Sequence, residues 1–268
     1  AILTVAAIVG TIIANQDATT IDVALNASTY KIIHGENTGD TEYFKKGFAS
    51  DEEREAYEAE LCATVEAEGA ALLKNENNAL PLAQGAKVSL FGHGSVDLMY
   101  GGTGSGSVDT SKAPNFKQAL ESQGISVNET LWDLYSSDSM MSKYSRMTPA
   151  SISDTLEANT QYAVNEAPWS ALSSAESSFA EYGDAAIVVL SRSGGEGADL
   201  PSGENGTSDN WISGQEGDGN YLALSAEEIE LLQNLKALKD NGTFKNIVVL
   251  INSSNAIELD FLNPEICG

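Results

Sequence analysis

Three short apolar runs constrain the fold of this chain more than any other feature of its sequence. They are Lys87–Gly92, Ala185–Leu190 and Asn246–Ile251, and each is rich in β-branched residues without polar alternation. Such runs are typical of parallel strands that are covered on both faces. The sequence therefore predicts at least three buried strands of a largely parallel sheet.

Helical patterns separate these runs. Asn115–Gln123 predicts a short helix, and Ser225–Asp240 predicts the clearest one, with Ser225 and Glu228 as a capping box. Its core-facing stripe consists of leucines 231, 232, 235 and 238. The alternation of strand and helix favours an α/β fold with a mostly parallel sheet sandwiched by helices. Residues 131–178 indicate loops and helices.

The first 14 residues carry no charge and predict an N-terminal hydrophobic helix. A membrane-spanning helix needs about 20 such residues, and a longer run is expected if the start of the protein is missing at Ala1. No small-x-small cleavage site follows, which favours an uncleaved signal anchor over a removed signal peptide. The alternative is a buried core helix. We expect residues 15–46 to be a stem, 47–268 to be the folded domain, and the protein to lie at the extracellular face of the cell membrane or to be secreted.

Composition excludes several classes of function. The net charge of −25 repels nucleic acid, because binding to a phosphate backbone draws on Lys and Arg. Only two cysteines, Cys62 and Cys267, are present, so at most one disulfide is possible. The two histidines, His34 and His93, have no ligand cluster around them in the sequence, which makes a zinc site improbable. We expect no metal and no cofactor.

Two glycine-rich segments each follow a predicted strand, where open α/β sheets place their ligand sites. The first is residues 101–107, GGTGSGS, and the second is residues 191–199, SRSGGEGAD. The first lacks the Gly-Lys-Ser/Thr ending of a phosphate-binding loop. Its glycines still let the backbone approach a ligand closely and donate N–H groups to it, so Gly102, Thr103, Gly104 and Ser105 are candidate substrate-binding residues. A flexible surface loop is the alternative.

In the second segment, Glu196 lies between Gly195 and Gly197, where no bulky neighbour limits the approach of a substrate. A carboxyl group in a partly enclosed site of this kind can serve as a general acid. The alternative is an ordinary solvated loop glutamate.

Six motifs in order resemble the second, α/β-sandwich domain of glycoside hydrolase family 3, which includes β-glucosidases. They are ATVEAEGAALLKNENNALPL at 63–82, KVSLFGHGS at 87–95, GGTGSGSV at 101–108, SRSGGEGADL at 191–200, and the LSAEEIELLQNL and NIVVLINSSNAIEL segments. The resemblance covers about residues 47–268. It implies a retaining mechanism with an Asp nucleophile on a (β/α)₈ barrel and a general acid/base on the sandwich.

The resemblance also implies roles for single residues. Glu196 matches the acid/base glutamate, and Asp199 matches the aspartate that follows the Gly-Glu-Gly motif, although Leu200 stands where the family often has Arg. Arg192 is a candidate for orienting the loop or touching the sugar, with a structural ion pair as the alternative. Trp211 is a candidate for stacking on a sugar ring, and an exposed or locally packed Trp is equally compatible.

These features predict the anchor, stem and sandwich domain of an exported bacterial exo-acting β-glycosidase of the β-glucosidase type. We expect the chain to be a fragment, with the barrel beyond Gly268 as in the subgroup with swapped domain order, and to be inactive alone. Its expected partners are a β-linked oligosaccharide or aryl β-glycoside, the barrel of the same protein and a membrane. The alternative is a non-catalytic carbohydrate- or nucleotide-binding α/β module.

Overall fold

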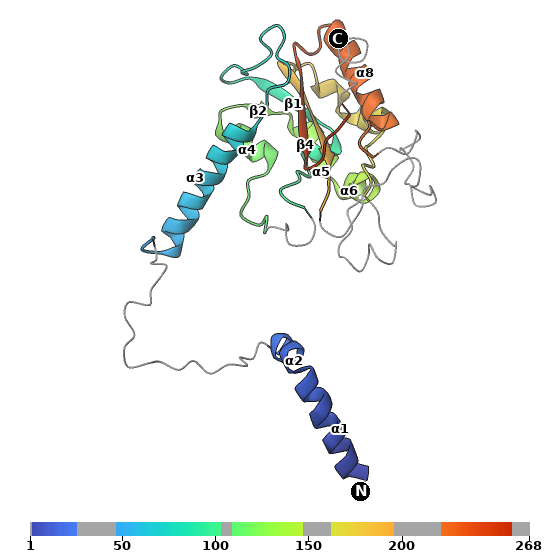
Figure 1. The fold of residues 1–268 in the computed structure, drawn as a ribbon. Helices are drawn as coiled ribbons and strands as arrows, with labels where there is room; N and C mark the ends of the chain where they lie inside the picture. The colour runs from blue at the N-terminus through green and yellow to red at the C-terminus, as the bar shows by residue number, and fades with distance from the viewer. Residues whose placement is uncertain (1, 26–46, 103–108, 147–161, 196–220, 259–268) are drawn as a thin grey trace. The chain divides into compact units, whose positions relative to one another are not determined.

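The structure is a computed structural model that describes residues 2–25, 47–102, 109–146, 162–195 and 221–258. By its internal contacts the chain divides into two units, Ala1–Leu72 and Leu73–Gly268 (Figure 1). The predicted domain boundaries at residues 14 and 46 stay predictions.

The first unit contains three helices: α1 (Ile2–Gln16), α2 (Ala18–Ala24) and α3 (Asp51–Gly69). The predicted N-terminal hydrophobic helix is confirmed as α1, which buries none of its residues within the described structure. No single helix among the described residues is long and apolar enough to cross a membrane, whereas α1 and α2 together, bent by 76°, meet the length and composition criteria.

Helix α3 begins after the N-cap residue Ser50. The Ser50 hydroxyl accepts a hydrogen bond from the Glu53 N–H, and the Glu53 carboxylate accepts one from the Ala49 N–H at 2.7 Å. The negative charges of the first turn, residues 51–53, also suit the positive end of the helix dipole.

The second unit is built on a four-stranded parallel sheet with the order β2-β1-β3-β4. Strands β1 (Lys87–Phe91), β3 (Ala185–Arg192) and β4 (Ile247–Ser253) coincide with the three apolar runs, which confirms the predicted α/β class. Strand β2 (Ser126–Val127) was not predicted, because two residues are too few to show an apolar run or an alternating pattern. The chain reverses its direction of travel across the sheet between β1 and β3, which makes this pair the topological switch point.

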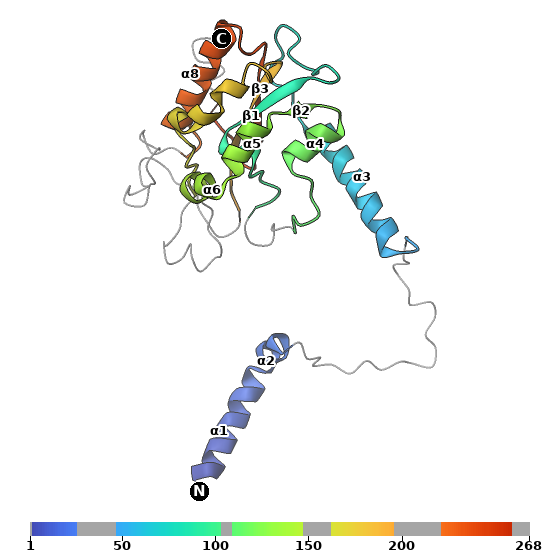
Figure 2. The same ribbon diagram turned by 180° about the vertical axis from the view of Figure 1, so that it is seen from behind.

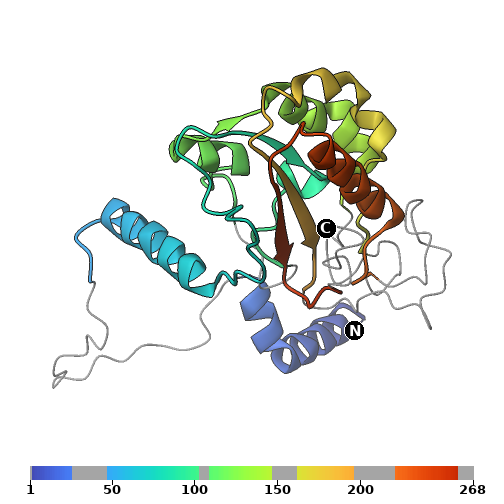
Figure 3. The same ribbon diagram turned by 90° about the horizontal axis from the view of Figure 1, so that it is seen from above.

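Residues on the two faces of the sheet belong to separate hydrophobic clusters. In β3, Ala186, Val188 and Leu190 face a cluster formed with α5 (Glu129–Ser136), α6 (Asp138–Tyr144), the 3₁₀ segment η3 (Trp169–Ser178) and α8 (Ala226–Asp240). Ala185 and Ile187 face the other cluster, which includes side chains of α4 (Phe116–Ser122). Figures 2 and 3 show α4 on one side of the strands and α8 with η3 on the other. Helices cover both faces of β1 and β3, whose apolar residues are buried as the strand composition predicted. The prediction of a third buried strand was wrong, because β4 lies at the edge of the sheet and is only partly buried, with Leu250 38% exposed.

The helix ends follow the sequence signals. Ser225 and Glu228 form the predicted capping box of α8, and Asn115 forms a second one with Gln118 at α4. Gly124 and Gly242 take positive φ angles of 78° and 84° just after these helices, a conformation that glycine adopts without steric cost.

Candidate functional site

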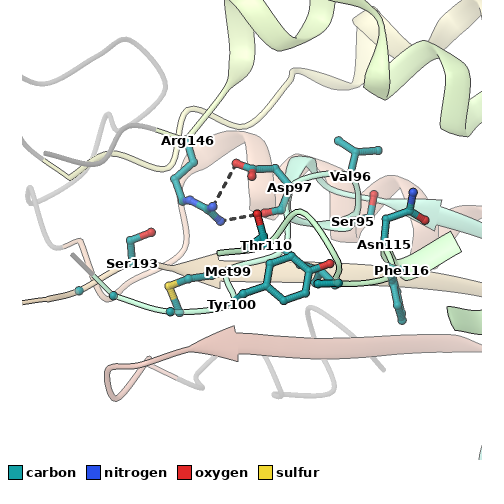
Figure 4. Close-up of a pocket in the computed structure, with 15 residues that line it drawn as sticks. Ser95, Val96, Asp97, Met99, Tyr100, Thr110, Asn115, Phe116, Arg146 and Ser193 are labelled. Atoms are coloured by element: carbon teal, nitrogen blue, oxygen red, sulfur yellow. Dashed lines mark hydrogen bonds and ion pairs between the residues drawn. The ribbon is translucent and has the colours of Figure 1, made fainter. Parts of the chain in front are cut away.

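A cavity of about 480 Å³ lies beyond the carboxyl ends of β1 and β3, at the switch point of the sheet (Figure 4). Loops after adjacent strands diverge at such a point and leave a crevice between them. Its lining comes from the chain after β1, the start of α4, Arg146 just after α6, and the chain after β3. The lining residues are Ser95, Val96, Asp97, Leu98, Met99, Tyr100, Gly101, Gly102, Thr110, Ala113, Asn115, Phe116, Arg146, Ser193 and Gly194.

The two glycine-rich segments meet at the edge of this cavity. A Cβ atom on Gly102 would lie 2.7 Å from the carbonyl oxygen of Gly194, a distance that real side chains do not tolerate. Only glycine at position 102 therefore permits this backbone approach. The contact brings together the starts of the two segments that the sequence singled out separately.

Most of the predicted site residues lie outside the described part of the chain. These are Thr103, Gly104, Ser105, Glu196, Asp199 and Trp211. Gly102 and Arg192 are described, and Gly195 precedes Glu196 directly. The described residues thus show where both segments begin, and the roles of the six other residues stay predictions.

Arg192, the last residue of β3, is fully buried and faces the Glu228 carboxylate. Its guanidinium forms a bidentate pair with Glu228 at 2.7 and 2.8 Å and donates to the carbonyl oxygens of Tyr221, Ala223 and Ser191. Burial on its own would lower the pKa of Arg192, but the carboxylate raises it, so the guanidinium stays charged. This contact ties the end of β3 to the start of α8, the structural ion pair that the sequence left open as one role.

The Ser193 carbonyl, one residue further on, accepts two hydrogen bonds. One comes from the Tyr221 hydroxyl at 3.1 Å and the other from Asn255 Nδ2 at 3.1 Å. Burial raises the pKa of Tyr221 to about 12, so its hydroxyl remains a donor throughout the physiological range. The backbone that leads to Glu196 is therefore held from two sides.

An ion pair that the sequence did not single out borders the cavity. Arg146 Nη2 lies 3.1 Å from Asp97 Oδ2, and Arg146 Nη1 donates to the Asp97 carbonyl at 2.9 Å (Figure 4). Nε2 of His93 lies 3.4 Å from the same Asp97 oxygen. Burial would raise the pKa of Asp97, but the His93 contact and the Arg146 charge lower it below its ordinary value. Both residues present charge to the cavity from separate segments, a pairing that spacing alone could not reveal.

A second carboxyl group lies deeper, beneath this pair. Glu166 is buried and accepts hydrogen bonds from the backbone N–H groups of His93, at 2.7 Å, and Ala167, at 2.9 Å. Burial raises the pKa of Glu166 to about 7, and these hydrogen bonds only partly offset that effect. The group titrates near neutrality and fixes the turn that follows β1.

Within the described residues, no three His, Cys, Asp or Glu side chains come together as metal ligands. Cys62 is an exposed free thiol, and Cys267 lies outside the described part of the chain.

Comparison with known proteins decides the family. The sequence profile of the glycosyl hydrolase family 3 C-terminal domain matches residues 70–267. The chain belongs to this family. β-Glucosidase A of Butyrivibrio fibrisolvens is 34% identical over 146 residues, which is 52% of this chain and 15% of that protein.

Solved structures of family 3 β-glucosidases share the fold. A β-glucosidase from Paenibacillus barengoltzii superposes with a TM-score of 0.54 at 26% identity, over 78% of this chain and 20% of the other. β-Glucosidase 3B from Thermotoga neapolitana, in complex with glucose, gives a TM-score of 0.53 at 24% identity, over 77% of this chain and 26% of the other, and supports the fold alone. The chain thus spans between 15% and 26% of the length of these relatives.

Proposed function

We propose that this domain supplies the general acid/base of a retaining, exo-acting β-glycosidase that removes terminal β-linked sugars. Glu196 is the acid/base, and the nucleophile is an aspartate on a (β/α)₈ barrel outside this chain. The named relatives are β-glucosidases, which makes a β-linked glucose the first substrate to test.

The observation that carries the proposal is the meeting of the two glycine-rich segments beside the cavity. Gly194 packs against Gly102 at the cavity's edge, and Glu196 follows two residues later in the sequence. Glu196 therefore belongs to a segment that starts at the edge of the cavity, which supports a role for its carboxyl group in the chemistry of a bound substrate. Glycines on both sides of Glu196 also leave room for a sugar.

A retaining glycosidase reaction needs two carboxyl groups about 5–5.5 Å apart, here those of Glu196 and the barrel aspartate. In the first step the aspartate attacks the anomeric carbon while Glu196 donates its proton to the leaving oxygen. In the second step Glu196, now a carboxylate, takes a proton from water, which attacks the glycosyl-enzyme and releases the sugar with its configuration retained.

Replacing Glu196 with alanine in the complete enzyme tests this role. An aryl β-glucoside with a good leaving group needs little protonation, so formation of the glycosyl-enzyme should slow only modestly. Deglycosylation needs the base and should slow by about 10²–10⁴-fold. The intermediate should accumulate, and KM should fall together with kcat. Azide attacks without losing a proton, so it should restore turnover and yield the β-glycosyl azide.

Glu204→Ala and Glu216→Ala provide matched controls, because both glutamates follow Glu196 within 20 residues or so of sequence. They should keep near-normal rates without azide. A Glu196→Ala enzyme that retains near-normal kcat on natural oligosaccharides, with loss of activity in one of the controls instead, would move the acid/base to that residue.

We also propose that residues 1–14 hold the protein at the outer face of a membrane. The uncharged run and the combined length of α1 and α2 support this placement. Fractionation of cells that express the full gene should recover the enzyme with membranes in a detergent-extractable form. Recovery only in the cytosol would contradict it.

A further inference from the structure

The Asn252 side chain links the two segments that line the candidate site. It extends from the carboxyl end of β4 and contacts both the chain after β1 and the chain of β3. Met99 N–H donates to Asn252 Oδ1 at 2.7 Å, and Asn252 Nδ2 donates to the Met99 carbonyl at 3.0 Å. The Ser191 hydroxyl donates to the same Oδ1 at 3.1 Å.

We propose that Asn252 is a positioning residue that clamps the two glycine-rich segments in register and thereby places the acid/base Glu196. This inference rests on the proposed function for its catalytic part. The clamp itself is a property of the fold and can be tested without activity.

The primary amide suits this position for a chemical reason. It offers an acceptor and a donor side by side, as a neighbouring strand's backbone would, and so pairs with both polar groups of one residue. The pair with Met99 fixes the rotation of that backbone as well as its distance. Met99 lies three residues before Gly102, so the clamp sets where the first segment begins.

The second segment is held from the same strand end. Ser191 pairs directly with Asn252 across the sheet, so the hydroxyl and the amide are brought together by the β3–β4 register. Three residues later, Asn255 Nδ2 donates to the Ser193 carbonyl, and a Cβ on Gly194 would lie 2.6 Å from that nitrogen. The end of β4 therefore contacts the second segment and the chain that leads into the first within a short stretch of sequence.

This arrangement constrains the backbone on both sides of the cavity, at Met99 through the Asn252 amide and at Ser191 through its hydroxyl. Without Asn252, the N–H and C=O of Met99 lose the hydrogen-bond partners that they have in the described structure. The loss destabilises the backbone conformation of Met99, which lines the cavity.

Hydrogen exchange of the complete enzyme tests the clamp directly. Asn252→Ala should speed exchange of the peptide that contains the Met99 amide by about five- to tenfold, as expected for the loss of a hydrogen bond with a net value near 1–1.5 kcal/mol. Asn246→Ala is the matched control, because Asn246 lies at the opposite end of β4 and donates to the Asp184 carbonyl. It should leave this peptide unchanged. Equal exchange in Asn252→Ala and wild type would overturn the clamp.

Kinetics of the same variants test the placement of Glu196. Asn252→Ala should lower kcat on an aryl β-glucoside by about tenfold or more while KM changes little, since misplacement of a catalytic group acts on the transition state. Asn246→Ala should keep both constants. Faster exchange with unchanged kcat would overturn the positioning role but leave the clamp.

Asn252→Asp provides a signature that lost packing cannot mimic. A protonated carboxyl offers one donor and one acceptor, as the amide does, whereas the carboxylate offers acceptors only. The kcat of Asn252→Asp, divided by that of wild type at each pH, should therefore rise as the pH falls from 7.5 to 4.5, and the Met99 peptide should regain protection. A ratio that does not change with pH would overturn hydrogen bonding as the basis of the clamp. A wild-type enzyme without glycosidase activity would instead refute the proposed function, and exchange alone would then decide the clamp.

Discussion

Arg192 uses all five of its N–H donors inside the protein, two of them on the Glu228 carboxylate. The pair with Glu228 holds the start of the second glycine-rich segment against the start of α8. Loss of the charge on one partner leaves the other buried without compensation, which is far more costly than loss of an exposed pair. Tyr221 and Ala223, whose carbonyls accept from Arg192, then lose part of their anchor.

Glu228→Gln should lower the free energy of unfolding by about 3–5 kcal/mol. The amide keeps the shape of the side chain but removes the charge opposite Arg192. Lys245→Gln is the control, because the Lys245–Asp184 pair is exposed, with 73% of the lysine side chain accessible. Its loss should cost less than about 1 kcal/mol. Urea denaturation of both variants measures the difference, and equal effects would show that the buried pair contributes no more than a surface pair.

Glu166 should make stability fall as the pH rises from about 4.5 to about 7. Burial raises its pKa from an ordinary 4.5 to about 7 in the folded state, so the folded protein binds the proton more tightly than the unfolded chain does. The favourable contribution is complete below the unfolded pKa and is lost as the pH passes through the folded one.

Glu166→Gln should therefore flatten this decline in the free energy of unfolding by about 3 kcal/mol, the equivalent of the shift. The difference between wild type and variant at each pH isolates Glu166 from the many other carboxyl groups of this acidic chain. Parallel curves for the two proteins would contradict a raised pKa.

At the scale of elements, the sequence predicted the strands and helices that have a periodic or continuous apolar pattern. It did not predict the two-residue strand β2 or contacts between residues far apart in the chain. The β-branched runs identified β1, β3 and β4, because parallel strands between helices are apolar at successive positions. The same pattern did not show that β4 lies at the sheet edge and is only partly buried. β3 continues to Arg192, two residues past its apolar run, because its register with β4 extends to Ser253. The Arg146–Asp97 pair joins residues 49 apart and left no local pattern.

The position of Asn252 carries one signal in the sequence. A polar amide that directly follows a buried parallel strand lies at the edge where such sheets form their sites. In NIVVLINSSN the apolar run ends in asparagines 252 and 255. The sequence could not show that Met99 is the partner of Asn252, because Met99 contributes only its backbone N–H and C=O.

Helix α8 depends on its capping box at the element scale. Ser225 Oγ accepts from the Glu228 N–H at 3.2 Å, and the Ser225 N–H donates to the Glu228 carboxylate at 2.9 Å. Ser225→Ala removes the first of these bonds and should lower the free energy of unfolding by about 1 kcal/mol. Ser142→Ala, on the exposed surface of α6, should change it by less than about 0.5 kcal/mol. Thermal denaturation of both variants measures this, and an unchanged Tm in Ser225→Ala would show that the cap is dispensable.

At the scale of the whole molecule, the proposed function gives this domain one side of a shared active site. The cavity beside β1 and β3 collects backbone donors, an ion pair and the segment that leads to Glu196. Under the proposed mechanism it lacks the nucleophile, and a single carboxyl group cannot form the covalent intermediate that divides the reaction into two easier steps. Catalysis should therefore require the barrel.

The 268-residue chain, purified alone, should release no aglycone from an aryl β-glucoside above the buffer rate, and the complete protein should turn it over with retained configuration. The physical reason is that positioning both carboxyl groups on one sugar accounts for much of the rate enhancement, and this chain positions only one. The complete protein with Glu196→Ala, supplied with azide, is the positive control for a functional nucleophile. Colour release with an aryl glycoside measures turnover, and ¹H NMR of the first product gives its anomer. Turnover by the chain alone, abolished by a substitution within it, would place the nucleophile among its own carboxyl groups and require a different assignment of the catalytic pair.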